Sequence, residues 1–183
     1  MISMIEKKLA LHHLMKGVIA HPSDTVYGLA CLAINPSAIK ELIGLKKRDL
    51  DKGFILLASD VEYVLPYIDN NLNINLLTKL GQLTTIQTTY LVPKSESTSS
   101  LISGSNDLVA VRITSNSLVR YFCENTDSAL ISTSANLQGQ KVATNMTELK
   151  TYFNKSLSYV LPPNKYNSEP SRIIDLVTGK RHR

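Results

Sequence analysis

Short apolar runs alternate along this chain with longer segments in which apolar residues recur every three or four positions. The runs have the length of buried strands, and the longer segments have the period of helices that bury one face. The runs predict strands at residues 18–20, 54–58, 89–93, 108–113, 129–132, 159–161 and 173–176. The helical period predicts helices at residues 4–16, 36–46, 60–67, 72–82 and 117–124, with one more after Asn145.

Local capping signals place several of these helix ends. Asn35 followed by Pro36 is a cap with a first-turn proline, and Asp60 can cap the helix that ends at Tyr67. Asn145 and Glu148 have the spacing of a capping box, which would turn Met146, Leu149 and Phe153 inward. The first helix has two apolar stripes, so we expect it to pack on two sides. Strands that alternate with helices indicate an α/β (α+β) fold of about seven strands.

Composition limits the chain to one ordinary domain. With 183 residues, 43 % of them hydrophobic, it can bury one core, so we expect residues 1–183 to form a single domain. No run has transmembrane length and the N-terminus lacks a signal-peptide pattern, which predicts a cytoplasmic protein with no membrane partner. Cys31 and Cys123 stand far apart without histidines at ligand spacing, so no disulfide and no protein metal site are predicted. The net charge of +5 favours anionic partners.

Two polar segments carry candidate chemistry. Lys46 and Arg48 lie at a predicted helix end, and residues 132–136 form a row of small hydroxyl and amide side chains at a strand exit. Together they could hold a polyphosphate, although neither resembles a P-loop. The plainer alternatives are a solvated helix end favoured by the helix dipole and a structural turn.

Two further sites stand out. Residues 21–31 run from a strand through a proline turn with hydroxyl and carboxylate groups, which suits either a small polar ligand or a self-capped turn. Arg112 lies within an apolar strand and therefore needs a carboxylate or phosphate partner. The serine-rich residues 95–105 predict a mobile surface loop rather than a linker.

Five segments, in the order in which they occur, resemble motifs of the YrdC/TsaC family of threonylcarbamoyl-adenylate synthases. They are residues 21–31, 46–53, 110–113, 132–139 and 170–175. The resemblance covers nearly the whole chain and corresponds to the short form of the family. It implies a twisted, mixed sheet flanked by helices, with the site on a basic concave face.

The resemblance implies a reaction that joins L-threonine, bicarbonate or CO2, and ATP into threonylcarbamoyl-AMP, with release of pyrophosphate, for tRNA modification. It assigns the nucleotide to Lys46, Arg48, Ser134, Asn136 and Arg183, the first four being the predicted catalytic residues. Magnesium is expected with the phosphates, without a dedicated protein cage. A separate tRNA threonylcarbamoyl transferase complex would receive the unstable product.

The same resemblance assigns threonine to Thr25, Arg112, Ser132 and Ser171, with Arg112 facing the substrate carboxylate. The chain departs from the family at residues 84–89, where a Trp-Pro-Gly-Pro turn is usual and this chain has no tryptophan at all. The family motif therefore does not predict the shape of the nearby pocket wall in this chain. Ser23 replaces a usual threonine conservatively.

Two other classes of protein remain as alternatives. A tRNA or double-stranded RNA-binding module without adenylate-forming activity would fit the positive charge, although the chain has only eight Tyr and three Phe for base stacking. A module of a hydrogenase-maturation carbamoyltransferase would need acylphosphatase-like and zinc-finger parts, for which this chain has no room.

Overall fold

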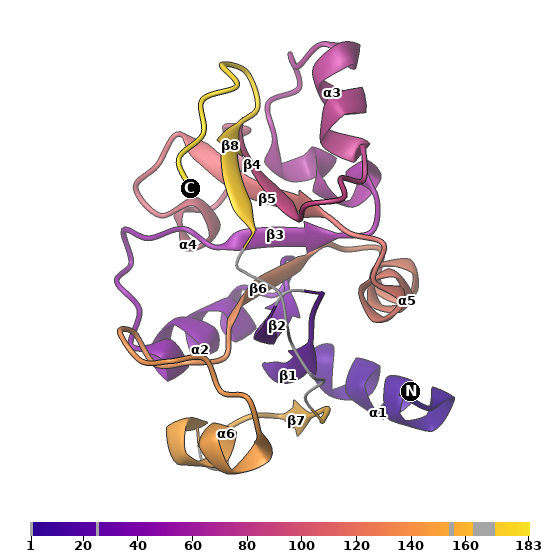
Figure 1. The fold of residues 1–183 in the computed structure, drawn as a ribbon, viewed down its shortest axis with the longest axis vertical. Coiled ribbons are helices and arrows are strands. Elements are labelled where there is room, and N and C mark those ends of the chain that lie inside the picture. The colour runs from indigo at the N-terminus through magenta and orange to yellow at the C-terminus, as the bar shows by residue number, and fades with distance from the viewer. Residues whose placement is uncertain (1, 25, 154–155, 163–170) are drawn as a thin grey trace.

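A single mixed sheet organises the computed structural model, which describes residues 2–24, 26–153, 156–162 and 171–183. Its eight strands lie in the order β7-β1-β2-β6-β3-β5-β4-β8 (Figure 1). The strands are β1 Ile19–Pro22, β2 Tyr27–Leu32, β3 Ile55–Ala58, β4 Thr88–Pro93, β5 Leu108–Ile113, β6 Leu130–Ser134, β7 Tyr159–Val160 and β8 Arg172–Asp175. The predicted α/β class with a mixed, helix-flanked sheet is confirmed, and β2 is the strand that the sequence pattern left unassigned.

Helices follow or precede most strands. They are α1 Met4–Leu14, α2 Pro36–Lys46, the 3₁₀ helix η1 Val61–Tyr67, α3 Ile74–Gly81, α4 Ser100–Ser103, α5 Ser117–Thr126 and α6 Met146–Phe153. Helix α2 contacts β2, α5 contacts β3, and α1 contacts β1, β2 and β7. These contacts place helices against both halves of the sheet, the β7-β1-β2 half and the β3-β5-β4-β8 half, as Figure 1 shows.

Strand β6 joins the two halves. It pairs antiparallel with β2 on one side and with β3 on the other. β1 and β2 form an antiparallel hairpin, whereas β3 runs parallel to β5 and β4 parallel to β8. Residues that pair directly across strands present their side chains to the same face. Gly28 with Ser134, and Ser132 with Ile55, therefore share one face of the sheet.

Local capping explains why the predicted helix ends were accurate. The side chain of Asn35 accepts from the backbone N–H of Ala38, and α2 ends at Lys46 as expected. Asp60 caps the next helix, which is 3₁₀ rather than α and contains Pro66. Asn145 also caps its helix, but Glu148 accepts from Thr144 instead of completing a box with Asn145.

Three other expectations about packing have mixed outcomes. Helix α1 buries Ala10 and Leu14 and contacts α5 as well as β1, β2 and β7, but members of both of its apolar stripes are exposed (Ile5 and Leu9 of one, Met4 and Met15 of the other). In α6, Leu149 and Phe153 are buried as predicted, but Met146 is exposed. The serine-rich segment is no loose loop over residues 99–106, because α4 forms there and packs against residues 51–54.

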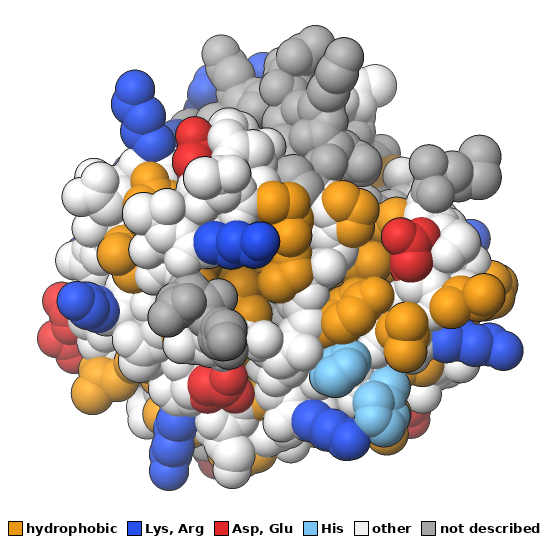
Figure 2. Space-filling model, turned by 90° about the horizontal axis from the view of Figure 1, so that it is seen from below, with side chains coloured by type: hydrophobic (Ala, Val, Ile, Leu, Met, Phe, Trp, Pro, Cys, Tyr) orange, Lys and Arg blue, Asp and Glu red, His pale blue; other side chains and the backbone are white. Residues whose placement is uncertain are grey.

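The α1, α6 and β7 side of the molecule gathers hydrophobic side chains, whereas its lysine and arginine side chains stand apart from one another (Figure 2). The His13 ring stacks on Tyr159 with 5.2 Å between centroids, which holds α1 against β7. None of the helices in the described part of the chain has the length and apolar character needed to cross a bilayer.

Candidate functional site

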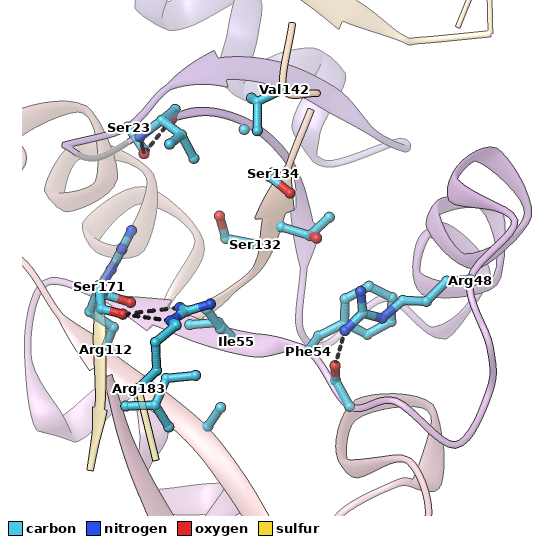
Figure 3. A pocket seen from close by; sticks show the side chains of 16 residues that line it. Ser23, Arg48, Phe54, Ile55, Arg112, Ser132, Ser134, Val142, Ser171 and Arg183 are labelled. Carbon is cyan, nitrogen blue, oxygen red and sulfur yellow. Dashed lines mark hydrogen bonds between the residues drawn. The ribbon is translucent and has the colours of Figure 1, made fainter. Parts of the chain in front are cut away.

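A cavity of about 380 Å³ opens on the sheet face that carries Gly28, Ser132 and Ser134 (Figure 3). Strands β2, β3, β5 and β6 contribute its walls, together with the loop after α2 and the C-terminal segment. Six of the predicted site residues line it: Arg48, Arg112, Ser132, Ser134, Ser171 and Arg183. Thr25 lies outside the described residues, and so does Pro170 of the last motif.

Arg48 enters the cavity because helix α2 stops just before it. Lys47 adopts a left-handed conformation with φ of 49°, which turns the chain out of the helix. The Arg48 side chain then donates from Nη2 to the carbonyl of Gly53 at 2.6 Å and from Nε to that of Lys52 at 3.2 Å. Burial lowers the pKa of Arg48, and the neighbouring Asp49 partly offsets this.

Lys46 behaves differently from Arg48. Lys46 is only 3 % exposed and does not line the cavity, so the alternative of a solvated lysine at the helix end is wrong. The ammonium donates to the carbonyl oxygens of Ser134 at 2.5 Å and Asn136 at 2.7 Å, and to Oδ1 of Asn136 at 3.1 Å. Burial, and to a lesser extent the charge of Arg48, lower the pKa of Lys46 to about 8.

The turn after β6 forms a closed hydrogen-bonded unit with Lys46. Ser134 Oγ donates to Asn136 Oδ1 at 2.6 Å, and Asn136 Nδ2 donates to the carbonyls of Leu137 and Gln140. Ser134 lines the cavity, whereas Asn136 does not. The structure therefore brings the basic motif and the serine-rich motif together, and Arg48, Ser132, Thr133 and Ser134 line the cavity.

Arg112 has an internal carboxylate partner. Its Nη2 lies 3.1 Å from Oδ1 of Asp24, and Thr114 Oγ1 donates to the other oxygen of that carboxylate at 2.9 Å. Arg112 is 5 % exposed and lines the cavity. Burial lowers the pKa of Arg112 while Asp24 opposes the shift, so the guanidinium keeps its charge in a nearly dry place.

The C-terminal segment brings a third guanidinium. Residues 181–183 fold back beside β8, where Arg181 bridges to Ile174 and the carbonyl of Arg183 accepts from the N–H of Ile173. The Arg183 side chain donates from Nε and Nη2 to the carbonyl of Ser171 at 3.1 and 3.0 Å. The hydroxyl of Ser171 lies 2.8 Å from that of Thr89.

His21 lies under the cavity wall beside Gly28. Its Nε2 would be 3.2 Å from a Cβ added to Gly28, so the absence of a side chain there makes room for the ring. Burial lowers the pKa of His21 to about 4, Arg112 adding to the shift and Asp24 opposing it. The imidazole is therefore neutral at physiological pH.

Sequence reasoning missed the apolar floor of the cavity, which consists of Phe54, Ile55, Ala110 and Ile173. A usable signal existed for Ala110, because it lies two positions before Arg112 on the same strand and so shares its face. The unusual residues 84–89 form a turn closed by threonines, in which the hydroxyls of Thr84 and Thr88 donate to the carbonyl of Ile86 at 2.6 and 2.8 Å. In the described chain, no group of three or more His, Cys, Asp or Glu side chains is placed to hold a metal ion.

Residues 14–183 match the Sua5/YciO/YrdC family, which carries the description telomere recombination. A threonylcarbamoyl-AMP synthase of Actinobacillus succinogenes is 36 % identical over 164 residues, 89 % of this chain and 90 % of that protein. Another, of Acinetobacter baylyi, is 34 % identical and covers 93 % of each chain.

Solved structures agree on the fold. Sua5 of P. abyssi, crystallised in complex with L-threonine, superposes with a TM-score of 0.83 at 23 % identity, covering 99 % of this chain and 54 % of that one. YciO of E. coli gives a TM-score of 0.74 at 21 % identity, covering 92 % of this chain and 82 % of that one.

Proposed function

The chain belongs to the Sua5/YciO/YrdC family, and from this we propose that it is a threonylcarbamoyl-AMP synthase. Such an enzyme is a nucleotidyltransferase that joins L-threonine, bicarbonate or CO2, and ATP, and releases pyrophosphate. The observation that carries the proposal is the convergence of three guanidinium groups, Arg48, Arg112 and Arg183, on one cavity with two serines of β6. Fixed positive charge beside hydroxyl donors suits a carboxylate and a polyphosphate held together.

The reaction depends on positioning more than on a nucleophilic side chain. The threonine amine adds to CO2 and loses a proton, which gives a carbamate. A carbamate oxygen then bonds to the α-phosphorus of ATP as the bond to the pyrophosphate oxygen breaks. Negative charge grows on the leaving pyrophosphate, so the groups that matter most are cations placed around it.

We assign the phosphates to Arg48 and Arg183. Figure 3 shows them on opposite sides of the floor made by Phe54 and Ile55, each with its guanidinium directed inward. Ser134, whose hydroxyl is aimed by its bond to Asn136, would donate to the nucleotide from the β6 wall. Direct contact of Lys46 or Asn136 with ATP stays a prediction, and it requires their present hydrogen bonds to rearrange.

We assign threonine to the part of the cavity beside Arg112. Its guanidinium would bind the threonine carboxylate, with Ser132 and Ser171 as hydroxyl partners for the rest of the molecule. The role of Thr25 in threonine binding stays a prediction from the motif. The ion pair with Asp24 restrains the orientation of the Arg112 guanidinium.

Magnesium belongs to the proposal as the ion that accompanies ATP. The donors that line the cavity are guanidinium and hydroxyl groups, and these suit phosphate oxygens rather than a metal ion. We therefore propose that phosphate oxygens and water are the magnesium ligands.

We further propose that the chain works in the cytoplasm and passes its product to a tRNA threonylcarbamoyl transferase complex. The product is a mixed anhydride that water hydrolyses, so a nearby acceptor would limit its loss. The net charge of +5 supports an additional tRNA contact, which would weaken steeply as salt is raised.

The decisive experiment incubates the protein with ATP, magnesium, bicarbonate and labelled threonine. We expect labelled threonylcarbamoyl-AMP and an equal amount of pyrophosphate, both dependent on threonine. RNA binding that is insensitive to ATP, without any adenylate formed, would instead favour the RNA-binding module.

A further inference from the structure

The guanidinium of Arg48 rests on an aromatic ring. Its central carbon lies 4.7 Å from the ring centroid of Phe54, and its hydrogen bond to the carbonyl of Gly53 holds it there (Figure 3). A second hydrogen bond, from Nε to the carbonyl of Lys52, further restrains the guanidinium. A guanidinium carries five N–H donors, and these two bonds use two of them. The side chain is thus restrained in direction while it keeps donors for an anion in the cavity.

The ring itself has little freedom to move. Phe54 is 3 % exposed, and its backbone N–H donates to the carbonyl of Ile102 at 2.8 Å. The residue before it, Gly53, approaches the next segment so closely that an added Cβ would lie 2.8 Å from the carbonyl oxygen of Ser103. The ring that supports Arg48 is therefore anchored to the α4 segment.

The α4 segment also holds the rest of the loop that carries Arg48. Lys52 bridges to Gly104, and the Asp51 carbonyl accepts from the backbone N–H of Ser105 and from Nδ2 of Asn106. Gly104 has φ of +64°, and an added Cβ would meet the Asp51 carbonyl oxygen at 2.3 Å, so this contact requires glycine. Residues 102–106 of the serine-rich stretch thus hold residues 51–54, and with them the loop that carries Arg48, in place.

We infer that Phe54 is a positioning residue for phosphate binding, and that it acts on ATP through Arg48. A ring face attracts a cation electrostatically, and the attraction strengthens where both groups are partly out of water. An aliphatic side chain at this position would fill the space but would not attract the guanidinium. This inference rests on the proposed function only for the identity of the ligand, since any polyphosphate would be held in the same way.

The test is a double-mutant cycle between Phe54 and Arg48. The variants are Phe54→Leu, which keeps an apolar side chain, Phe54→Tyr, which keeps the ring, Arg48→Ala, and Phe54→Leu combined with Arg48→Ala. The readouts are KM for ATP and kcat in pyrophosphate release, binding of inorganic tripolyphosphate by calorimetry, and the melting temperature of each variant.

We expect Phe54→Leu to weaken tripolyphosphate binding and raise KM for ATP by about fivefold to tenfold, the scale of a partly desolvated cation–π contact. Phe54→Tyr should stay close to the unmodified protein, and Phe54→Leu should have no further effect once Arg48 is alanine. The same loss from Phe54→Leu with and without Arg48 would overturn the inference, because the ring would then be only part of the wall. If no pyrophosphate is released, the proposed function fails, while the tripolyphosphate cycle still decides the role of Phe54.

Discussion

The ammonium of Lys46 donates a hydrogen bond to the backbone carbonyl of Asn136, 2.7 Å away, although 90 positions separate the two residues in the chain. This bond ties the end of helix α2 to the turn that follows β6. A charged side chain from one motif therefore fixes the backbone of the other, and Ser134 is held between them.

The first prediction compares Lys46 with its neighbour. Lys46→Met keeps the aliphatic stem but leaves buried carbonyls without a donor, which should lower the free energy of unfolding by about 1–3 kcal/mol. Lys47→Met, at an exposed position, should change it by less than about 0.5 kcal/mol. Urea denaturation measures both. Equal stability of the two variants would show that the ammonium does not hold the turn.

The second prediction concerns Arg112. Arg112→Lys retains the charge near Asp24 but loses the planar fork, so threonine binding should weaken by about tenfold or more while ATP binding changes little. Calorimetry with each substrate gives the two affinities. A variant that binds threonine normally and melts many degrees lower would assign Arg112 to the internal ion pair alone.

The third prediction concerns the choice of amino acid. Hydroxyl groups of Ser132 and Ser171 line the cavity near Arg112, and a buried polar group left without its partner costs about 1–3 kcal/mol. Threonine should therefore support pyrophosphate release at least about fivefold faster than valine or alanine at equal subsaturating concentration. Equal rates with the three amino acids would remove the threonine assignment from this part of the cavity.

The fourth prediction follows from His21, whose pKa burial lowers to about 4. In the unfolded chain the same group titrates near 6.5, so between these pH values the unfolded state binds more protons than the native state. The free energy of unfolding therefore falls as the pH is lowered. The stabilisation that comes from keeping His21 neutral is fully present above about pH 6.5. The free energy of unfolding should decline by up to about 3 kcal/mol towards pH 4 as this stabilisation is lost.

A matched variant isolates this contribution. His21→Phe keeps a flat ring beside Gly28 and cannot titrate, so its unfolding free energy should fall less between pH 7 and pH 4 than that of the unmodified protein. Parallel pH curves for the two proteins would contradict a buried, neutral His21.

The sequence predicted the elements whose determinants are local. Helix α2 is defined by Asn35, Pro36 and its own apolar period, β3 is a continuous apolar run, and β5 is apolar except for Arg112. Helix α4 has no such signal, because its four residues contain only two apolar side chains and are ordered by contact with residues 51–54. When a short segment is ordered only by contact with a distant segment, its local sequence pattern does not predict its structure.

The site was predictable to a similar extent. Arg112 could be identified because an arginine in an apolar strand must have a partner, and Arg48 and Ser134 followed from the family motifs. The burial of Lys46 could not be foreseen, since it depends on the β6 turn passing over the end of α2. The support of Arg48 by Phe54 likewise depends on where the chain goes after residue 48.

The central place of β6 has a consequence for how the protein folds. The first 113 residues contain the β1–β2 hairpin and the β3-β5-β4 group, but these two pieces share no hydrogen-bonded edge until residues 130–134 arrive between them. Pairings between segments so distant in sequence form slowly, because a large loop must close before any contact is gained. During synthesis the edges of β2 and β3 that pair with β6 would therefore stay unpaired until β6 emerges. The cavity, which residues 132–134 help to line, can form only after that.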